Sequence, residues 1–425
     1  MYRNRYVYLL LIVFSLGSLR VAAQEMTFEK EGYEQALAKA KQENRPVFID
    51  FYATWCGPCK MLEKEVFTDP EVKAYYDKNF VCVRVDVDKE QKLVQKYRIQ
   101  SMPTLVFLNS KGKEIRRLMG AEGKERFLHV GQEIMGERPV YPELYKQCQG
   151  EKKDLALMQT LLLETPSYVS EVGGAEGMKW RERATKMFQE YLALKGMDQM
   201  INNNDFQLFM LYQEPAKRND PTLNFVNTHH EAFEKVIEPQ MVWEYIISRQ
   251  SGLINTLAKA GNLAYQEELN RITGDMKDVF SKIGHTGLSV YDVMKSQADG
   301  YYALYAQKDE NKFLDLKDAY FQQMGELLSF NDYQEAIGQL VEARKGVLKP
   351  ASYERCLAWL DEASKLNLQP REQLDLSCLM ANCFRGLENN EKARACFNQA
   401  YILAMQLEDY RMQAQIKAVL EQLSE

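Results

Sequence analysis

Two cysteines near the N-terminus have the spacing of a reactive pair. Cys56 and Cys59 are separated by Gly57 and Pro58 and are preceded by Trp55. Thiol–disulfide exchange requires a thiolate that attacks and a second thiol close enough to resolve the mixed disulfide. A pair at the start of a helix supplies both, because the helix dipole and the free amides stabilise a thiolate at the first cysteine. We therefore predict that Cys56 attacks a disulfide and that Cys59, one turn further in, resolves it.

The same spacing occurs in half of a zinc site, so a structural metal centre is a competing interpretation. A complete site needs further ligands, and no second cysteine pair with metal spacing occurs between residues 24 and 137. The histidines show no ligand spacing: His129, His229, His230 and His285. The sequence therefore favours a redox pair, with no metal and no cofactor other than the disulfide of Cys56 and Cys59.

The segments around the cysteines alternate between strand and helix patterns. Short β-rich runs predict strands at 47–52, 80–87, 104–108 and 114–119. Helical spacing predicts a helix near 28–40, before the first strand, and further helices at 60–66, 71–78, 89–97 and 124–135. Thr68-Asp69-Pro70 interrupts the helix that follows the cysteines. The order is αβαβαββα when the interrupted helix is counted once.

A second motif, Ser101-Met102-Pro103-Thr104, leads into the 104–108 strand. Together with the 55–59 motif it resembles the active site of thioredoxin-fold proteins, and the resemblance covers residues 25–136. The helix before the first strand makes the layout most similar to the thioredoxin-like domain of exported disulfide-interchange reductases. The interruption at Asp69-Pro70 departs from ordinary thioredoxins. We expect a thioredoxin fold at residues 24–137, with a βαβαββα core and an N-terminal helical extension.

The resemblance implies a buried carboxylate at Asp50, behind the resolving cysteine. Such a group could take the proton of Cys59 during attack on the mixed disulfide, whereas a solvent-facing Asp50 would be a plain strand residue. Arg84 occupies a position where related domains often carry a lysine facing this acid. Arg84 either faces Asp50 and favours its ionised form, or points to solvent.

The same resemblance defines an expected substrate-binding surface. Gly57 is expected to permit the tight entry into the helix, Pro58 has no N–H to lose in the first turn, and Trp55 is expected to pack beside the site and limit solvent. Pro103 is expected to follow a cis peptide bond. That bond would turn the Met102 backbone toward the reactive cysteine, where it can pair with an extended substrate.

The Gly57-Pro58 dipeptide resembles that of reducing thioredoxins, so reduction of substrates is favoured over oxidation. An exported reductase stays active only if something supplies electrons. The expected partners are therefore proteins with thiols or disulfides as clients and an electron-donating thiol protein, which could be membrane-bound. A net charge of −6 argues against a nucleic-acid partner.

The N-terminus has the pattern of an export signal. Arg3 and Arg5 form a basic start, 7–16 is an apolar core, and 21–23 fits a small-residue cleavage site. We predict a signal peptide at residues 1–23, with an uncleaved anchor as the alternative. Cleavage would leave no stable membrane insertion and would place the protein in the periplasm or another extracytoplasmic compartment.

A chain of 425 residues is expected to contain more than one domain. Residues 138–144 are the predicted linker. Residues 145–425 are predicted to form an all-α domain of helical hairpins, which resembles tetratricopeptide repeats near 350–405. Outside the reactive pair, several cysteines are expected to be small core residues: Cys82, Cys356, Cys378, Cys383 and Cys396. A disulfide between Cys383 and Cys396, on successive predicted helices, is the alternative for those two.

These features lead to one leading hypothesis and one alternative. The leading hypothesis is an exported thiol–disulfide oxidoreductase that reduces protein disulfides through Cys56 and Cys59, with the helical domain binding clients or a partner. In the alternative, the helical domain makes the chain a peptide-binding or chaperone-like protein, or a disulfide isomerase, and the redox domain is auxiliary.

Overall fold

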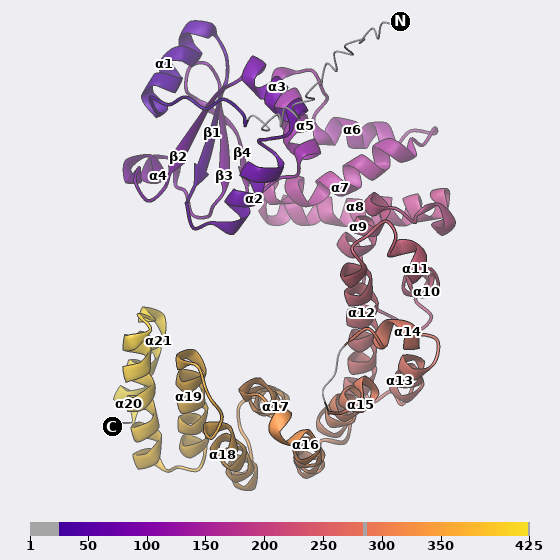
Figure 1. Ribbon diagram of the computed structural model, residues 1–425, viewed down its shortest axis with the longest axis vertical. Coiled ribbons are helices and arrows are strands. Elements are labelled where there is room, and N and C mark those ends of the chain that lie inside the picture. The colour runs from indigo at the N-terminus through magenta and orange to yellow at the C-terminus, as the bar shows by residue number, and fades with distance from the viewer. Residues whose placement is uncertain (1–24, 284–286, 424–425) are drawn as a thin grey trace, which may run out of the picture. The chain divides into compact units, whose positions relative to one another are not determined.

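The computed structural model describes residues 25–283 and 287–423 (Figure 1). The chain divides into two compact units, the N-terminal unit up to Gly196 and the C-terminal unit from Met197. The predicted signal peptide, 1–23, lies outside the described residues. Within the described ranges, no helix combines the length and the apolar character that crossing a membrane requires.

A mixed sheet lies at the centre of the N-terminal unit. In the described part of the chain four strands form it, in the order β2-β1-β3-β4. Strand β1 pairs in parallel with β2 and antiparallel with β3, and β4 extends the sheet antiparallel to β3. The strand bounds are Val47–Tyr52 for β1, Val81–Asp86 for β2, Thr104–Leu108 for β3 and Glu114–Met119 for β4. The expectation of a thioredoxin fold is confirmed.

Helices cover both faces of this sheet (Figure 1). Their bounds are Tyr33–Glu43 for α1, Gly57–Glu65 for α2, Pro70–Asn79 for α3, Gln91–Tyr97 for α4 and Lys124–Met135 for α5. Side chains of α1 and α4 belong to one buried cluster, and those of α2, α3 and α5 to a cluster on the other face. The predicted interruption after the cysteines separates α2 from α3, since the Asp69 carboxylate caps α3 and Pro70 occupies its first turn.

Three more helices belong to the same compact unit. They are α6 (Tyr141–Cys148), α7 (Leu155–Val172) and α8 (Gly174–Lys195). This division differs from the predicted one, which placed a linker at 138–144 and the start of a separate domain at 145. Tyr141 is fully buried in α6 and its hydroxyl hydrogen-bonds to Thr165 of α7 at 2.8 Å. The segment is therefore part of a packed helix.

A buried ion network joins α7 to β4 and α5. Glu133 of α5 accepts hydrogen bonds from Arg116 of β4, from Arg126 at 2.8 Å and from Arg138. Glu164 of α7 accepts from Arg126 at 3.3 Å and from Arg138 at 3.1 Å. The two carboxylates share two of these arginines. This sharing of partners across residues 126–164 explains why the compact unit continues past the predicted boundary.

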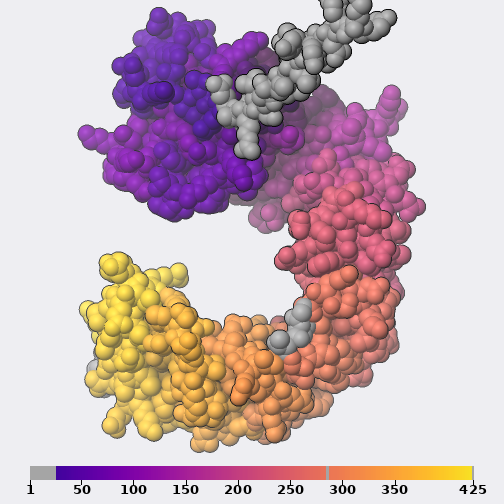
Figure 2. Space-filling view, in the orientation of Figure 1, coloured from indigo at the N-terminus to yellow at the C-terminus, as the bar shows by residue number. Residues whose placement is uncertain are grey.

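The C-terminal unit is helical throughout its described residues, as predicted. Its α-helices are α9 (Asn203–Leu211), α10 (Pro221–Thr228), α11 (His230–Phe233), α12 (Pro239–Lys259), α13 (Tyr265–Thr273), α14 (Lys277–Phe280), α15 (Val290–Tyr301), α16 (Glu310–Met324), α17 (Phe330–Ala343), α18 (Pro350–Ser364), α19 (Pro370–Gly386), α20 (Asn390–Gln406) and α21 (Tyr410–Gln422). In the space-filling view, side chains fill the space between the successive helices at the C-terminal end of the chain (Figure 2). The assignment of 350–405 to a repeat family remains a prediction.

The disulfide considered between Cys383 and Cys396 is not present. Both residues are free thiols. Cys383 belongs to a buried cluster that includes α18, whereas Cys396 packs against a different cluster formed with α20. The two sulfurs therefore face different neighbours, although their helices are successive.

Candidate active site

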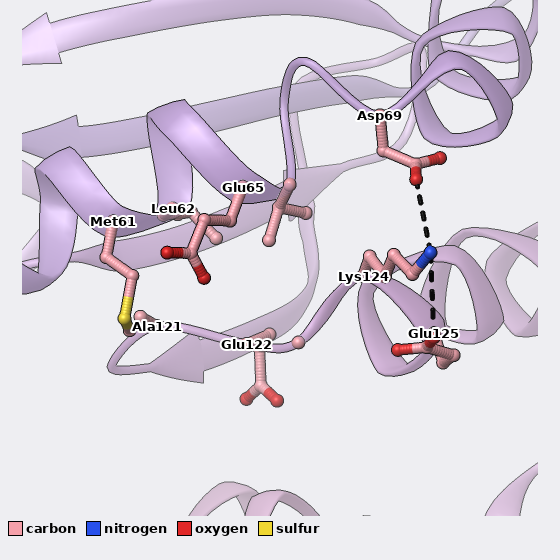
Figure 3. Close-up of a pocket in the computed structure, with 10 residues that line it drawn as sticks. Met61, Leu62, Glu65, Asp69, Ala121, Glu122, Lys124 and Glu125 are labelled. Carbon is pink, nitrogen blue, oxygen red and sulfur yellow. Dashed lines mark hydrogen bonds and ion pairs between the residues drawn. The ribbon is translucent and has the colours of Figure 1, made fainter. Parts of the chain in front are cut away.

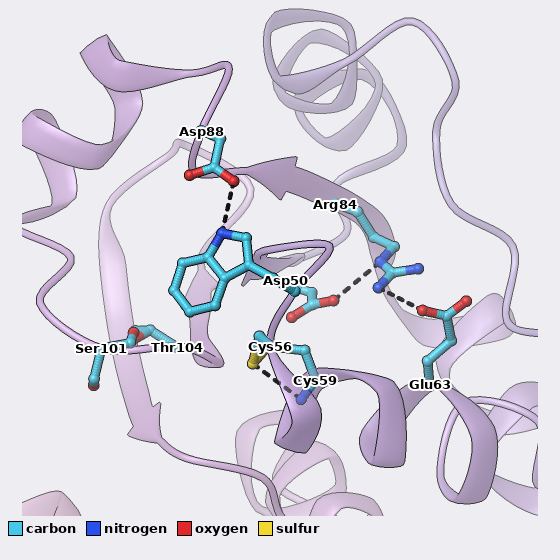
Figure 4. Close-up of a disulfide and its surroundings, with 9 residues drawn as sticks. Asp50, Cys56, Cys59, Glu63, Arg84, Asp88, Ser101 and Thr104 are labelled. Carbon is cyan, nitrogen blue, oxygen red and sulfur yellow. Dashed lines mark hydrogen bonds and ion pairs between the residues drawn. A yellow bond between two sulfur atoms is a disulfide. The ribbon is translucent and has the colours of Figure 1, made fainter. Parts of the chain in front are cut away.

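A disulfide joins Cys56 and Cys59 at the start of α2 (Figure 4). The two Cα atoms are 5.3 Å apart. Cys56 is the N-cap residue of α2, and the backbone N–H of Cys59 donates a hydrogen bond to its Sγ atom at 3.2 Å. After reduction, the same amide and the positive end of the helix dipole would stabilise a thiolate on Cys56. The structure thus places the pair as the sequence predicts.

Gly57 and Pro58, between the two cysteines, form the start of α2. Pro58 lies in the first turn of α2, where no intrahelical hydrogen bond is lost. Gly57 is the first residue of α2, where it was expected to permit a tight entry into the helix. Its φ is not positive, and a Cβ atom at this position would meet no heavy atom within 4 Å. The space beside Gly57 is open surface next to the disulfide.

Trp55 lies beside the disulfide but does not cover it. Its side chain is 65% exposed, and the indole N–H donates a hydrogen bond to Asp88 at 3.0 Å (Figure 4). Trp55 was expected to pack beside the site and limit solvent; it lies next to Cys56, and its ring is largely exposed. Asp88 holds the ring in an open position, where it can form part of a contact surface.

The second motif forms a loop before β3. The Met102–Pro103 peptide bond is cis, as predicted. The Thr104 hydroxyl donates a hydrogen bond to the Ser101 carbonyl at 2.7 Å, which holds the loop on both sides of the proline. Met102 packs against the buried cluster that contains Cys56 and Cys59. The structure therefore brings this loop and the cysteine pair together.

Asp50 lies in the middle of β1 and is buried, with 1% of its surface exposed. The solvent-facing alternative is thus excluded. Burial raises the pKa of Asp50 to about 6, although Arg84 acts in the opposite direction. The Asp50 Oδ1 atom has no hydrogen-bond partner among the described residues. Figure 4 shows the carboxyl group between the start of α2 and the Arg84 side chain.

Arg84 of β2 faces Asp50, which decides between its two predicted orientations. Its Nε atom donates to Asp50 Oδ2 at 3.1 Å and its Nη2 atom to Glu63 at 3.0 Å. Glu25 lies 3.6 Å from Nη1, and the guanidinium stacks over Tyr52 at 4.1 Å from the ring centroid. Arg84 therefore divides its charge among three carboxylates.

Three acidic residues of this site were missed in the sequence: Glu25, Glu63 and Asp88. A signal for Glu63 existed, because it follows Cys59 by four residues and must lie on the same face of α2. Asp88 and Glu25 gave no such signal, since their contacts depend on strand pairing and on the path of the chain before α1.

A cavity of about 560 Å³ lies alongside α2 (Figure 3). Met61, Leu62 and Glu65 of α2 line it together with Ala121 and Lys124. Lys124 is 3.4 Å from Asp69, which closes one end of the cavity. In the described ranges, no group of three or more His, Cys, Asp or Glu side chains is arranged to hold a metal ion.

Comparisons with known proteins agree with this geometry. Residues 33–134 match the model of the thioredoxin-like domain family. The thiol:disulfide interchange protein DsbD of Vibrio vulnificus is 37% identical over 131 residues, which cover 28% of this chain and 22% of that protein. Thioredoxin-1 of Drosophila melanogaster is 39% identical over 83 residues, which cover 20% of this chain and 71% of that protein.

The solution structure of a thioredoxin from Thermus thermophilus is 26% identical and covers 31% of this chain and 100% of that one, with a TM-score of 0.25. The chain spans about a fifth of the length of the DsbD proteins that it matches. With a reactive cysteine pair, a cis-proline loop and a thioredoxin of which it covers more than two thirds, the chain belongs to the thioredoxin family of thiol–disulfide oxidoreductases.

Proposed function

We propose that this chain is an exported thiol–disulfide oxidoreductase that reduces disulfides of client proteins through Cys56 and Cys59. The observation that carries the proposal is the disulfide at the N-terminus of α2, with the buried Asp50 carboxyl group behind it. The pattern of residues 1–23 supports export. The similarity to a thiol:disulfide interchange protein supports the reaction class.

The reaction begins with the reduced pair. The Cys56 thiolate attacks one sulfur of a client disulfide, the client S–S bond breaks, and the released client thiolate takes a proton from solvent. Cys59 then loses its proton and attacks the Cys56 sulfur of the mixed disulfide. The second client thiolate leaves, so two electrons have passed from the enzyme pair to the client.

Asp50 is the proposed acceptor of the Cys59 proton. With a pKa of about 6 it is mostly ionised at neutral pH, and its proton affinity is still close enough to neutrality for it to exchange a proton. Arg84 favours the ionised form, and the unpartnered Oδ1 atom is available to accept a hydrogen. The site therefore contains a nucleophile, a resolving thiol and a base.

The substrate-binding surface is proposed to consist of the exposed Trp55 ring, the open surface at Gly57 and Pro58, and the loop of Met102 and Pro103. The Gly57-Pro58 dipeptide supports reduction as the direction, since reducing thioredoxins have potentials of about −270 mV. An electron-donating thiol protein would then restore the dithiol after each cycle.

The C-terminal unit is proposed to bind clients or the electron donor. It is covalently attached to the redox site, so binding to it raises the effective concentration of a partner by about 10²–10⁴-fold in favourable geometries. A truncation that tests this should end at Gly196, since α6–α8 belong to the N-terminal unit. Client trapping that is identical with and without residues 197–425 would contradict recruitment of clients by the C-terminal unit.

Insulin reduction by the full-length chain with a small dithiol as electron source tests the proposed activity. We expect C56S to abolish turnover and C59S to accumulate mixed disulfides through Cys56. Equal trapping by C56S would contradict the assigned roles. A measured potential of the pair near −120 mV, typical of strong oxidants, would overturn reduction as the direction.

A further inference from the structure

A second pair of cysteines lies in the C-terminal unit. Cys356 of α18 is 0% exposed and Cys383 of α19 is 4% exposed, and both are free thiols. They belong to the same buried cluster, which also contains Leu360 and Leu376. These cysteines are separate from the redox site and are not used in the proposed reaction.

The packing of α18 against α19 brings the two sulfurs to the same level. Helix α19 follows α18 after a short turn, so the two run antiparallel. The Tyr353 ring lies directly against Gly386, where a Cβ atom would be 2.2 Å from the ring. Cys356 is three residues after Tyr353, and Cys383 is three residues before Gly386. In antiparallel helices, three residues forward on one helix and three residues back on the other run in the same direction in space. Cys356 and Cys383 therefore both lie about one turn from the contact between Tyr353 and Gly386, and they face each other.

Each thiol affects the pKa of the other. A side-chain hydrogen bond between them and the burial of the site raise the pKa of Cys356, while the same hydrogen bond lowers the pKa of Cys383. Cys383 is therefore the better thiolate of the two, and Cys356 is the thiol that remains protonated beside it.

The nearby cysteines provide a contrast. Cys378 and Cys396 pack against the cluster between α19 and α20, on the other face of α19. Burial alone raises the pKa of Cys396, and burial is the main cause for Cys378. Neither shows the thiol–thiol hydrogen bond that marks the pair on α18 and α19.

We propose that Cys356 and Cys383 are a second site of disulfide formation, which links α18 to α19 when the chain meets a low-molecular-weight disulfide such as oxidised glutathione. The Cys383 thiolate attacks one sulfur of the glutathione disulfide and releases one glutathione. Cys356 then loses its proton and attacks the Cys383 sulfur, which releases the second glutathione. Two electrons pass from the two cysteines to glutathione, and the two thiol protons end on the two glutathione molecules.

The burial of both sulfurs determines when this reaction occurs. Glutathione disulfide is too large to reach them while α18 and α19 are packed, so exchange requires the helices to separate or to be still folding. Once formed, the link is shielded in the same way from reductants. The inference does not depend on the activity of Cys56 and Cys59, and a chain without that activity would still form the link.

Peptide mapping tests the proposal on the full-length chain. The protein is unfolded in urea, refolded with a mixture of reduced and oxidised glutathione, alkylated and digested with trypsin without reduction. We expect peptide 356–365 to be linked to peptide 372–385 in most molecules. The second peptide contains both Cys378 and Cys383, so C378A should keep the link and C383A should abolish it.

Two further results decide the outcome. The oxidised chain should unfold at a higher urea concentration than the chain reduced with dithiothreitol, and this difference should decrease in C383A but not in C396A. Complete alkylation of Cys356 and Cys383 after refolding, or a link from Cys356 to Cys378 or Cys396, would overturn the proposal. The map of the unmodified chain gives this answer even where a variant fails to fold.

Discussion

Two buried carboxylates in the N-terminal unit bind arginine but differ in their proton affinity. Asp50 is 1% exposed and Glu133 is 7% exposed, so burial alone would raise the pKa of each. For Asp50 burial prevails and raises the pKa to about 6. For Glu133 the opposing charges of Arg126 and Arg116 outweigh burial, and the pKa is lowered.

The difference arises from how the arginines are shared. Glu133 is surrounded by guanidinium groups, each with hydrogen bonds to it. Asp50 has Arg84, whose charge is also attracted to Glu63 and Glu25. A carboxylate that accepts hydrogen bonds from three guanidinium groups is fixed in its ionised form. One that has a single cation, itself divided among three carboxylates, keeps a proton affinity that catalysis can use.

The largest effect is expected from R126M, which breaks the Glu133 cluster. Arg126 contacts Glu133 at 2.8 Å and Glu164 at 3.3 Å, and removal leaves two buried carboxylates with fewer cations. We expect the free energy of unfolding to fall by about 3–5 kcal/mol, measured by urea unfolding. The insulin-reducing activity of the molecules that remain folded should be unchanged.

A matched control removes an exposed ion pair of the same unit. E182Q breaks the Glu182–Lys186 pair on the surface of α8, for which we expect no measurable change in stability. A loss in R126M no larger than in E182Q would show that the buried network does not hold α7 to the sheet.

The second effect concerns the rate of the resolving step in D50N. Without a base for the Cys59 proton, we expect resolution of the mixed disulfide to slow by about 10²-fold at pH 7, while attack by Cys56 changes little. In the unmodified protein, resolution should slow as pH falls through about 6, where Asp50 becomes protonated. Stopped-flow single turnovers between pH 5 and 8 measure both features.

D88N is the control for this experiment, because it neutralises the aspartate that holds Trp55 and leaves Asp50 in place. Its resolution rate should keep the inflection near pH 6. An inflection that also persists in D50N would assign the titration to another group.

The third effect is a gain in the stability of D50N, although the same substitution is expected to slow the reaction. The pKa of Asp50 rises from the usual 3.8 to about 6 on folding, so its favourable contribution is present below about pH 4 and is lost as pH rises through 6. Above pH 6 the buried charge destabilises the fold by at most about 3 kcal/mol. D50N should therefore be more stable than the unmodified protein at pH 8. The gain should be about 1–2 kcal/mol and thus smaller than this bound, because Arg84 loses a charged partner.

Urea unfolding at pH 4 and at pH 8 measures this difference. At pH 4 most of the gain should disappear, because Asp50 is then protonated in the folded protein. A gain of equal size at both values would mean that the charge of Asp50 is not its source.

The smallest effect is expected from E63Q, which tests the sharing of Arg84 directly. The charge of Glu63 raises the pKa of Asp50 and takes one arm of Arg84. Without it, the pKa of Asp50 should fall below about 6, and the pH at which resolution slows should move down. E65Q on the same helix is the control. An upward movement in E63Q would show that Glu63 acts mainly by positioning Arg84.

The elements predicted correctly from the sequence are those whose ends are marked by residues next to them in the chain. Strands β1, β3 and β4 and helix α5 have the predicted bounds, because glycine, proline and turn residues mark the ends of their apolar runs. The first half of helix α6 fell within the predicted linker, 138–144. Pro142 occupies the first turn of α6, where proline begins a helix rather than breaking one.

The site shows the same dependence on distance along the chain. The cysteine pair was predicted from its motif, and the cis Pro103 and the buried Asp50 from resemblance to a family. The partition of Arg84 among Asp50, Glu63 and Glu25 was not predictable, because these residues are far apart in the sequence. The pairing of β1 with β2 brings Arg84 to Asp50, and the packing of α2 and of the segment before α1 brings the other two carboxylates.

The buried ion network that joins α7 to β4 and α5 has a consequence for protein engineering. A thioredoxin domain is commonly excised or exchanged as a unit, with its boundary placed at the end of its last helix. In this chain, such a cut after residue 137 would leave Glu133 and Arg126 on one fragment and Glu164 on the other. The transplantable module therefore ends near Gly196, because an ordinary thioredoxin substituted for residues 25–137 would leave Glu164 of α7 with Arg138 but without Arg126.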